Sequence, residues 1–144
     1  NKGVIDEKLW QKILNSIYQQ MCHVRGHINF SRIAVRNNHA ITETLTLYIV
    51  GLLFPWMDKK GEWKKKGKTW FEQEISYQIY PDGTFLQFSM NYHRVLIQLL
   101  TKAIILAELN NESFDDIVYE RAHCSVNFLY QCQSLENGYL PNYG

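Results

Sequence analysis

Two stretches of the chain are apolar at most positions, and each is followed by a stretch in which apolar residues recur at helical spacing. Residues 40–54 and 95–109 are rich in Leu, Ile, Val and Ala. Residues 62–79 and 114–133 instead mix apolar side chains with Lys, Glu and Gln. The alternation predicts helices that are buried nearly all round, each followed by a helix with one face in water.

Local signals assign the remaining segments. Asp6 can cap an amphipathic helix that runs to about Arg25, and Gly26 is expected to stop it. Residues 27–36 have no sustained period and are interpreted as a loop, and residues 56–61 as a linker. Because no stretch shows strand alternation of convincing length, the predicted fold class is all-α.

The pattern of buried and amphipathic helices repeats along the chain. Asn38 and Tyr92, which stand where the two apolar runs open, are 54 residues apart. Two turn signals, at Gly83 and Gly138, are 55 residues apart. A period of this length is typical of stacked helical hairpins. We therefore expect residues 1–144 to be part of a single domain, an incomplete α/α toroid fragment built of antiparallel helical hairpins.

Composition and charge restrict the classes of partner. Basic and acidic residues number 15 and 14, so no overall field favours a polyanion, and the Lys-rich run 59–68 is interpreted as a solvated face. Motifs for nucleic acids, nucleotides, metals or a Ser or Cys nucleophile are absent. Arg94, Lys102 and Glu108 make the second apolar run a poor membrane span. We expect no nucleic-acid partner, no membrane span, no metal site and no cofactor in this segment.

A polar cluster opens each apolar run. The clusters are Asn37, Asn38 and His39 in the first case, and Asn91, Tyr92, His93 and Arg94 in the second. Helix N-termini favour anions, because their N–H groups are free and the helix dipole is positive there. Asn38 and His39 could bind a carboxylate, and Tyr92 could transfer a proton beside it. Glu43, one turn after His39, could orient the imidazole.

Each of these residues also has an ordinary structural interpretation. Asn37 alone is most simply a helix cap, His39 alone a structural histidine, and Tyr92 alone a packed tyrosine. Their occurrence at equivalent places in a repeat favours one shared site for an acidic ligand. Asn37, Glu43, Asn91, His93 and Arg94 are then predicted substrate-binding residues. His93 and Arg94 point to other sides of the helix than Tyr92, so at most one of them shares its cleft.

Four segments resemble the heparinase II/III-like family of polysaccharide lyases. They are Asn37–Glu43, Gly51–Pro55, Tyr80–Gly83 continuing to Asn91–His93, and Gly138–Gly144. The resemblance implies an incomplete α/α toroid followed by a β-sandwich domain, which this chain does not contain. It also implies β-elimination at a uronic acid of an acidic polysaccharide such as heparin or heparan sulfate, and a periplasmic or secreted location.

The same resemblance implies roles for three residues. Asn38 falls on the position that neutralises the uronate carboxylate, with His39 beside it, and Tyr92 falls on the catalytic base or acid. A further catalytic His and a bound metal belong to the missing β-sandwich, so this fragment alone is expected to be inactive. Relatives that act on alginate or are tied to bacterial surface polysaccharides leave the substrate open.

Two other functions remain as alternatives. A non-catalytic helical-repeat module would bind glycan or protein without forming a product. A glycoside hydrolase on a similar toroid would need two carboxylates flanking a cleft. Only Glu43 lies near the clusters in sequence, so the hydrolase ranks last.

Overall fold

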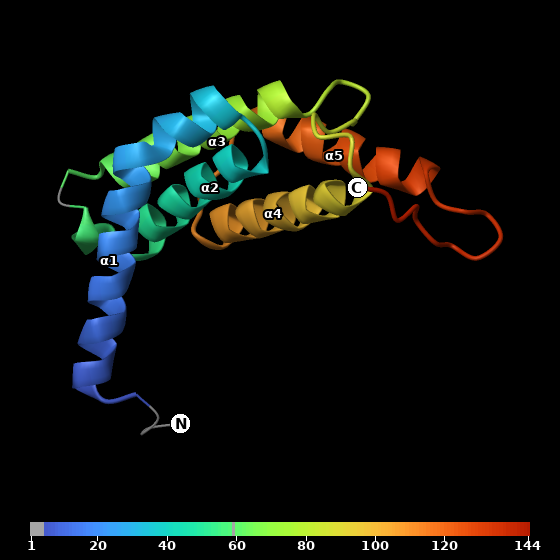
Figure 1. Ribbon diagram of the computed structural model, residues 1–144. Helices are drawn as coiled ribbons and strands as arrows, with labels where there is room; N and C mark the ends of the chain where they lie inside the picture. The colour runs from blue at the N-terminus through green and yellow to red at the C-terminus, as the bar shows by residue number, and fades with distance from the viewer. Residues whose placement is uncertain (1–4, 59) are drawn as a thin grey trace.

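A computed structural model describes residues 5–58 and 60–144 and confirms the all-α fold (Figure 1). The elements are α1 (Glu7–Asn29), a π-helix (Phe30–Val35), α2 (Asn38–Leu53), a 3-10 turn (Pro55–Met57), α3 (Glu62–Gln78), α4 (Met90–Leu109) and α5 (Asp116–Gln131). Within the described ranges, the one β-type pairing is an isolated antiparallel bridge between Ile79 and Phe85.

Polar side chains fix where four of the five α-helices in the described part of the chain begin. The caps of α1, α2, α4 and α5 are Asp6, Asn37, Ser89 and Asp115. Each side-chain oxygen accepts a backbone N–H of the first turn, at distances from 2.6 to 3.2 Å. Such a cap stabilises a helix by about 1 kcal/mol relative to alanine. The predicted starts of α2 and α4 are therefore confirmed.

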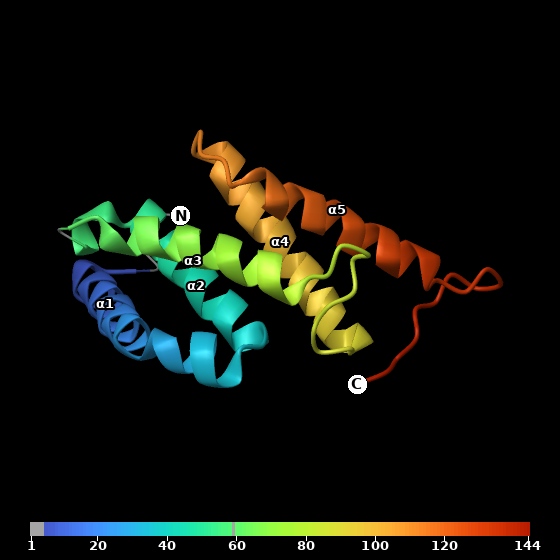
Figure 2. The same cartoon turned by 90° about the horizontal axis from the view of Figure 1, so that it is seen from above.

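The helices pair as antiparallel hairpins, as the repeat predicted. In Figures 1 and 2, α2 and α3 run in opposite directions side by side, and α4 and α5 do the same. Both views also show that α2 and α4 begin at the same end of the molecule. The polar clusters at these two helix starts therefore lie at one end.

One main core joins the two hairpins. Its large, fully buried members include Ile41, Leu45, Tyr48, Phe71, Ile75, Leu96 and Leu100. The α2 and α3 backbones approach closely at Gly51 and Gly67, where a Cβ atom would overlap the backbone of the facing helix at Lys64 and Tyr48. Only glycine permits this approach, which brings the α3 side chains directly onto α2.

The prediction that Gly26 ends the first helix is wrong, and so is the loop over residues 27–36. The helix continues to Asn29, and a π-helix then leads to Val35. A glycine inside a helix costs about 1 kcal/mol. Burial of Ile28 against α2 and α3 stabilises the following turns and outweighs that cost, and the buried Ser31 hydroxyl is hydrogen-bonded to Glu43.

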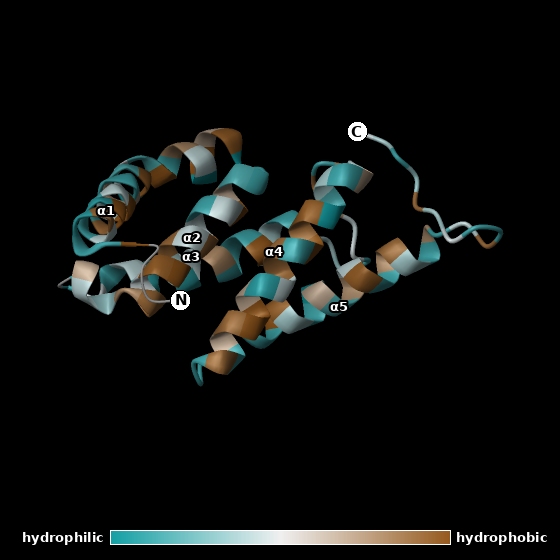
Figure 3. Cartoon of the chain, turned by 90° about the horizontal axis from the view of Figure 1, so that it is seen from below, coloured by the Kyte–Doolittle hydropathy of each residue, from teal (hydrophilic) through white to brown (hydrophobic). Residues whose placement is uncertain are grey.

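The prediction of all-round burial holds better for α2 than for α4. On α2, Ala40, Ile41, Leu45 and Leu47 are almost completely buried. On α4, Val95, Ile105 and Leu109 are 39%, 49% and 74% exposed, which contradicts the prediction. Figure 3 shows hydrophobic residues on α4 and on α5. No described helix combines the length and the apolar content that a membrane crossing requires.

The two turn signals form the same local structure. Gly83 and Gly138 both have positive φ, 88° and 71°. One residue earlier, Asp82 and Asn137 each accept a hydrogen bond from the backbone N–H two positions on, at 2.9 and 3.0 Å. The sequence repeat at these turns is therefore also a structural repeat.

Candidate functional site

The α2 start (Asn37–His39) presents one capped helix N-terminus. The Asn37 side chain accepts the His39 N–H at 3.0 Å, so this asparagine serves as the cap. Asn38 is half-buried and the His39 side chain is exposed. The Asn37 side chain is therefore engaged in capping the helix. Asn38 and His39 are the two polar side chains of the first cluster that remain available to bind a ligand.

The α4 start (Ser89–Tyr92) presents the second capped helix N-terminus. Ser89 is the cap, and its hydroxyl accepts the Tyr92 N–H at 3.2 Å. The Tyr92 side chain is 43% exposed, unlike the buried tyrosine Tyr48 of α2. Part of the Tyr92 side chain is therefore accessible from solvent.

A hydrogen bond connects the two starts. The backbone N–H of Asn38 donates to the side-chain Oε1 of Gln87 at 3.3 Å. Gln87 precedes the α4 start by two residues, so the segment that leads into α4 crosses the α2 start. The Asn38–Gln87 contact therefore joins the start of α2 to the segment that leads into α4, and the two helices run parallel to each other in both views.

The segment of residues 140–144 crosses the α4 start in the same manner. The Met90 N–H donates to the Tyr143 carbonyl at 3.0 Å. The Arg94 guanidinium donates to the Pro141 carbonyl at 3.1 Å, and the Asn91 amide donates to the Gly144 carbonyl at 2.5 Å. The segment after α3 thus contacts the start of α2, and the segment after α5 contacts the start of α4.

Asn91 and Arg94, both predicted substrate-binding residues, take part in this crossing. The Arg94 guanidinium also donates to the Asn91 side-chain oxygen at 3.0 Å. Their polar groups therefore hold residues 140–144 against α4. We leave both residues out of the proposed site.

His93 lies in the core, although it was predicted to bind substrate. Its side chain is 2% exposed, stacks on Phe128 and has Nε2 3.1 Å from the Ser125 carbonyl. Burial lowers the pKa of His93, and the Ser125 carbonyl opposes that shift only in part. The structure thus places His93 as a neutral packing residue between α4 and α5, away from solvent.

Glu43 accepts a hydrogen bond from the Ser31 hydroxyl at 2.7 Å, which ties α2 to the π-helix. In the part of the chain that the structure describes, no hydrogen bond joins Glu43 to His39. The predicted orientation of the imidazole by Glu43 is therefore not seen, and Glu43 acts as an anchor of the preceding segment.

Behind the α2 start lies a buried charge network that sequence reasoning missed. Glu74 of α3 is 1% exposed, and its carboxylate lies 3.3 and 3.6 Å from the Nε atoms of Arg32 and Arg36. The Gln78 amide donates to Glu74 at 3.1 Å and to the Asn37 carbonyl at 3.0 Å. Glu74 and Gln78 lie on the same helical face as the apolar residues Phe71 and Ile75. This spacing is the one sequence signal that could have predicted their burial.

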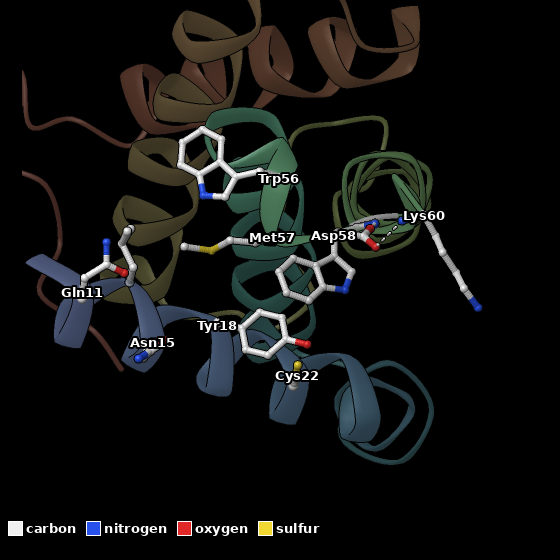
Figure 4. Close-up of a pocket in the computed structure, with 10 residues that line it drawn as sticks. Gln11, Asn15, Tyr18, Cys22, Trp56, Met57, Asp58 and Lys60 are labelled. Carbon is white, nitrogen blue, oxygen red and sulfur yellow. Dashed lines mark hydrogen bonds between the residues drawn. The ribbon is translucent and has the colours of Figure 1, made fainter.

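A cavity of about 580 Å³ opens at the other end of α2. It lies between α1, the 3-10 turn and α3, and Figure 4 shows Tyr18 and Trp56 on its walls with Met57 between them. None of the candidate site residues lines it. The described residues also include no group of three or more His, Cys, Asp or Glu side chains placed to hold a metal ion.

Comparisons with known proteins point to one family. A family model described as Heparinase II/III N-terminus matches residues 2–130. A heparin-sulfate lyase of Bacteroides stercoris is 29% identical over 76 residues, which cover 53% of this chain and 11% of that protein. A heparin-sulfate lyase of Pedobacter heparinus is 29% identical over 92 residues, 64% of this chain and 13% of that protein. No solved structure matches. The matched parts thus span only a small share of these curated relatives.

Proposed function

Because the chain belongs to the Heparinase II/III N-terminus family, we propose that it carries half of the active site of a polysaccharide lyase. The proposed substrate is a uronic-acid-containing acidic polysaccharide of the heparin or heparan sulfate type, and the reaction is β-elimination. The support comes from the two heparin-sulfate lyases that the chain resembles and from the chemistry of the two helix starts.

The α2 start supplies the proposed carboxylate site. The Asn38 amide and the exposed His39 imidazole can donate hydrogen bonds to a uronate, and the positive end of the helix dipole lies beside them. Neutralising the carboxylate acidifies the adjacent carbon, because the negative charge that develops there is delocalised into the carboxylate.

Tyr92 supplies the proposed proton transfer. Its phenol can take the proton from the carbon next to the carboxylate, or give a proton to the departing glycosidic oxygen. The C–H electrons form a carbon–carbon double bond while the bond to that oxygen breaks. The product is an unsaturated uronate and a new chain end, with no water consumed.

The observation that carries this proposal is the shared position of the two starts. Asn38 and the exposed Tyr92 open parallel inner helices at one end of the domain, and the Asn38–Gln87 hydrogen bond joins the two segments. Elimination requires the carboxylate-binding group and the proton carrier to contact the same sugar residue at the same time.

The rest of the active site is proposed to come from a β-sandwich domain of the same protein, with a further catalytic histidine. This chain alone is therefore expected to be inactive, and the whole protein is expected to act in the periplasm or outside the cell. Its partner is the acidic glycan.

The test uses the whole protein and a panel of heparan sulfate, heparin, alginate and hyaluronan. Elimination creates an unsaturated uronate that absorbs in the near ultraviolet. We expect absorbance to grow with at least one glycan, and Tyr92→Phe to lower kcat about 100-fold or more without a change in fold. Tyr18→Phe is the matched control, because Tyr18 is 46% exposed and lies on α1 at the 580 Å³ cavity, at the opposite end of α2 from Asn38.

Two outcomes would contradict the proposal. Saturable glycan binding with no product from any member of the panel would identify a non-catalytic binding module. Full turnover in Tyr92→Phe would remove Tyr92 from the chemistry. Activity on alginate or a bacterial surface polysaccharide alone would support the proposed lyase reaction and replace the proposed substrate.

A further inference from the structure

The position of Glu74 gives the α2 start an unusual support. Glu74 belongs to the outer helix α3, yet its carboxylate is almost fully buried beside two arginines from the π-helix segment. A buried ion pair is weak evidence for stability, because desolvation offsets most of the attraction. The network is therefore better explained by what it holds in place than by a gain in stability.

One connection runs through Gln78. Its amide nitrogen donates to the Glu74 carboxylate at 3.1 Å and to the Asn37 carbonyl at 3.0 Å. The two protons of one amide group are thus used by Glu74 on one side and by the residue before Asn38 on the other. Since Gln78 is itself completely buried, its amide cannot exchange these hydrogen bonds for bonds to solvent water.

The other connection runs through Arg36. This residue has a positive φ of 44°, in the left-handed region that non-glycine side chains rarely adopt, and it directs the chain from the π-helix into the Asn37 cap. Its N–H donates to the Ser31 carbonyl at 2.7 Å, and its guanidinium lies 3.2 Å from the centre of the Tyr77 ring. The Glu74 carboxylate completes the set of contacts that holds this conformation.

We propose that Glu74 is a positioning residue that fixes Asn38 for uronate recognition, through Gln78 and Arg36. This inference rests on the proposed function. Glu74 does not touch the substrate. Its charge orients the two side chains that hold the backbone immediately before Asn38.

The principal variant is Glu74→Gln in the whole protein, which keeps the side-chain volume and removes the charge. We expect kcat on the preferred glycan to fall about 10- to 100-fold, because small misplacements of a reacting group cost this much, and KM to change less than threefold. Glu112→Gln is the matched control. It breaks the 2.6 Å ion pair between Lys64 and Glu112 and should leave kcat unchanged.

A second kinetic comparison separates positioning from general damage. In an Asn38→Ala background, Glu74→Gln should lower kcat less than twofold further, because Glu74 acts through Asn38. A full 10- to 100-fold loss in that background would overturn the inference. If Glu74→Gln fails to fold, Gln78→Leu keeps the charges, removes the link to Asn37 and should lower kcat in the same direction.

Hydrogen exchange provides a readout that does not depend on turnover. Glu74→Gln should raise deuterium uptake in a peptide covering residues 36–43 severalfold, while Glu112→Gln should not. Unchanged uptake in that peptide would overturn the inference even if the protein is an active lyase. If the wild type makes no product from any glycan, the proposed function fails, and the exchange result still decides whether Glu74 fixes this segment.

Discussion

The α2–α3 and α4–α5 hairpins share the same arrangement of helices and turns, but different residues hold their helices together. In the α2–α3 hairpin, glycines at positions 51 and 67 bring the helix backbones together, and the buried Glu74 network braces the helix start. In the α4–α5 hairpin, the ring of His93 fills the space between the helices. In each hairpin, the segment after the next outer helix crosses the helix start.

The difference separates what the repeat requires from what each copy adds. The caps, the glycine turns and the crossing segments recur, so they belong to the hairpin plan. The Glu74 network and the solvent-exposed Tyr92 each occur at one helix start, so they are candidates for function rather than folding. In the proposed mechanism, the carboxylate site belongs to α2, which the Glu74 network supports, and the proton carrier belongs to α4.

Gly67→Ala should have the largest effect on the first hairpin. Its Cβ would overlap the backbone of Tyr48, so the helices must separate, and overpacking of this kind costs about 1–3 kcal/mol. Thermal or urea unfolding measures the change. Gly26→Ala is the matched control, because nothing lies within 4 Å of its Cβ, and it should stabilise α1 by up to about 1 kcal/mol.

Equal and small effects of these two glycine substitutions would contradict the account of the first hairpin. They would mean that α2 and α3 can separate without loss, and that the support of the α2 start does not depend on close backbone contact.

His93 should make the stability of the second hairpin depend on pH. Burial lowers its pKa in the folded state, so below its ordinary value of about 6.5 the unfolded chain binds the proton more readily. Stability is therefore complete above that pH and falls as the pH drops, by at most about 1.4 kcal/mol per pH unit from this group. His93→Gln removes the titration and can keep the hydrogen bond to Ser125.

Melting temperatures from pH 7.5 down to 5.5 measure this effect. The gap between the wild type and His93→Gln should narrow as the pH falls. A constant gap for His93→Gln would show that His93 is protonated equally in both states.

Much of this fold follows from the apolar pattern and the caps. The polar clusters at Asn37–His39 and Asn91–Arg94 were predicted to open the two apolar helices, and the helices begin at Asn38 and Met90. Gly26 misled the prediction, since its small local cost is overcome by the burial of Ile28, which only the tertiary structure reveals. Exposure along α4 was likewise invisible, because it depends on which neighbours cover the helix.

The candidate site was only partly predictable. The 54-residue spacing brought Asn38 and Tyr92 to one end of the domain, as helical hairpins require. The spacing does not show which residues next to Tyr92 face the core, so His93, Asn91 and Arg94 were predicted to bind substrate. In the structure, His93 packs in the core, and Asn91 and Arg94 hydrogen-bond to residues 140–144. Glu74 was hidden because a charged residue on an amphipathic helix normally faces water.

The central claim is that the two helix starts act on one sugar. A double-mutant cycle of Asn38→Ala and Tyr92→Phe in the whole protein, followed as formation of unsaturated uronate, tests it most directly. If both groups serve one elimination step, each single change should cost about 100-fold or more in kcat, and the double variant should be little worse than the poorer single variant. Two losses that multiply in full would show that Asn38 and Tyr92 act independently, and would contradict a shared site.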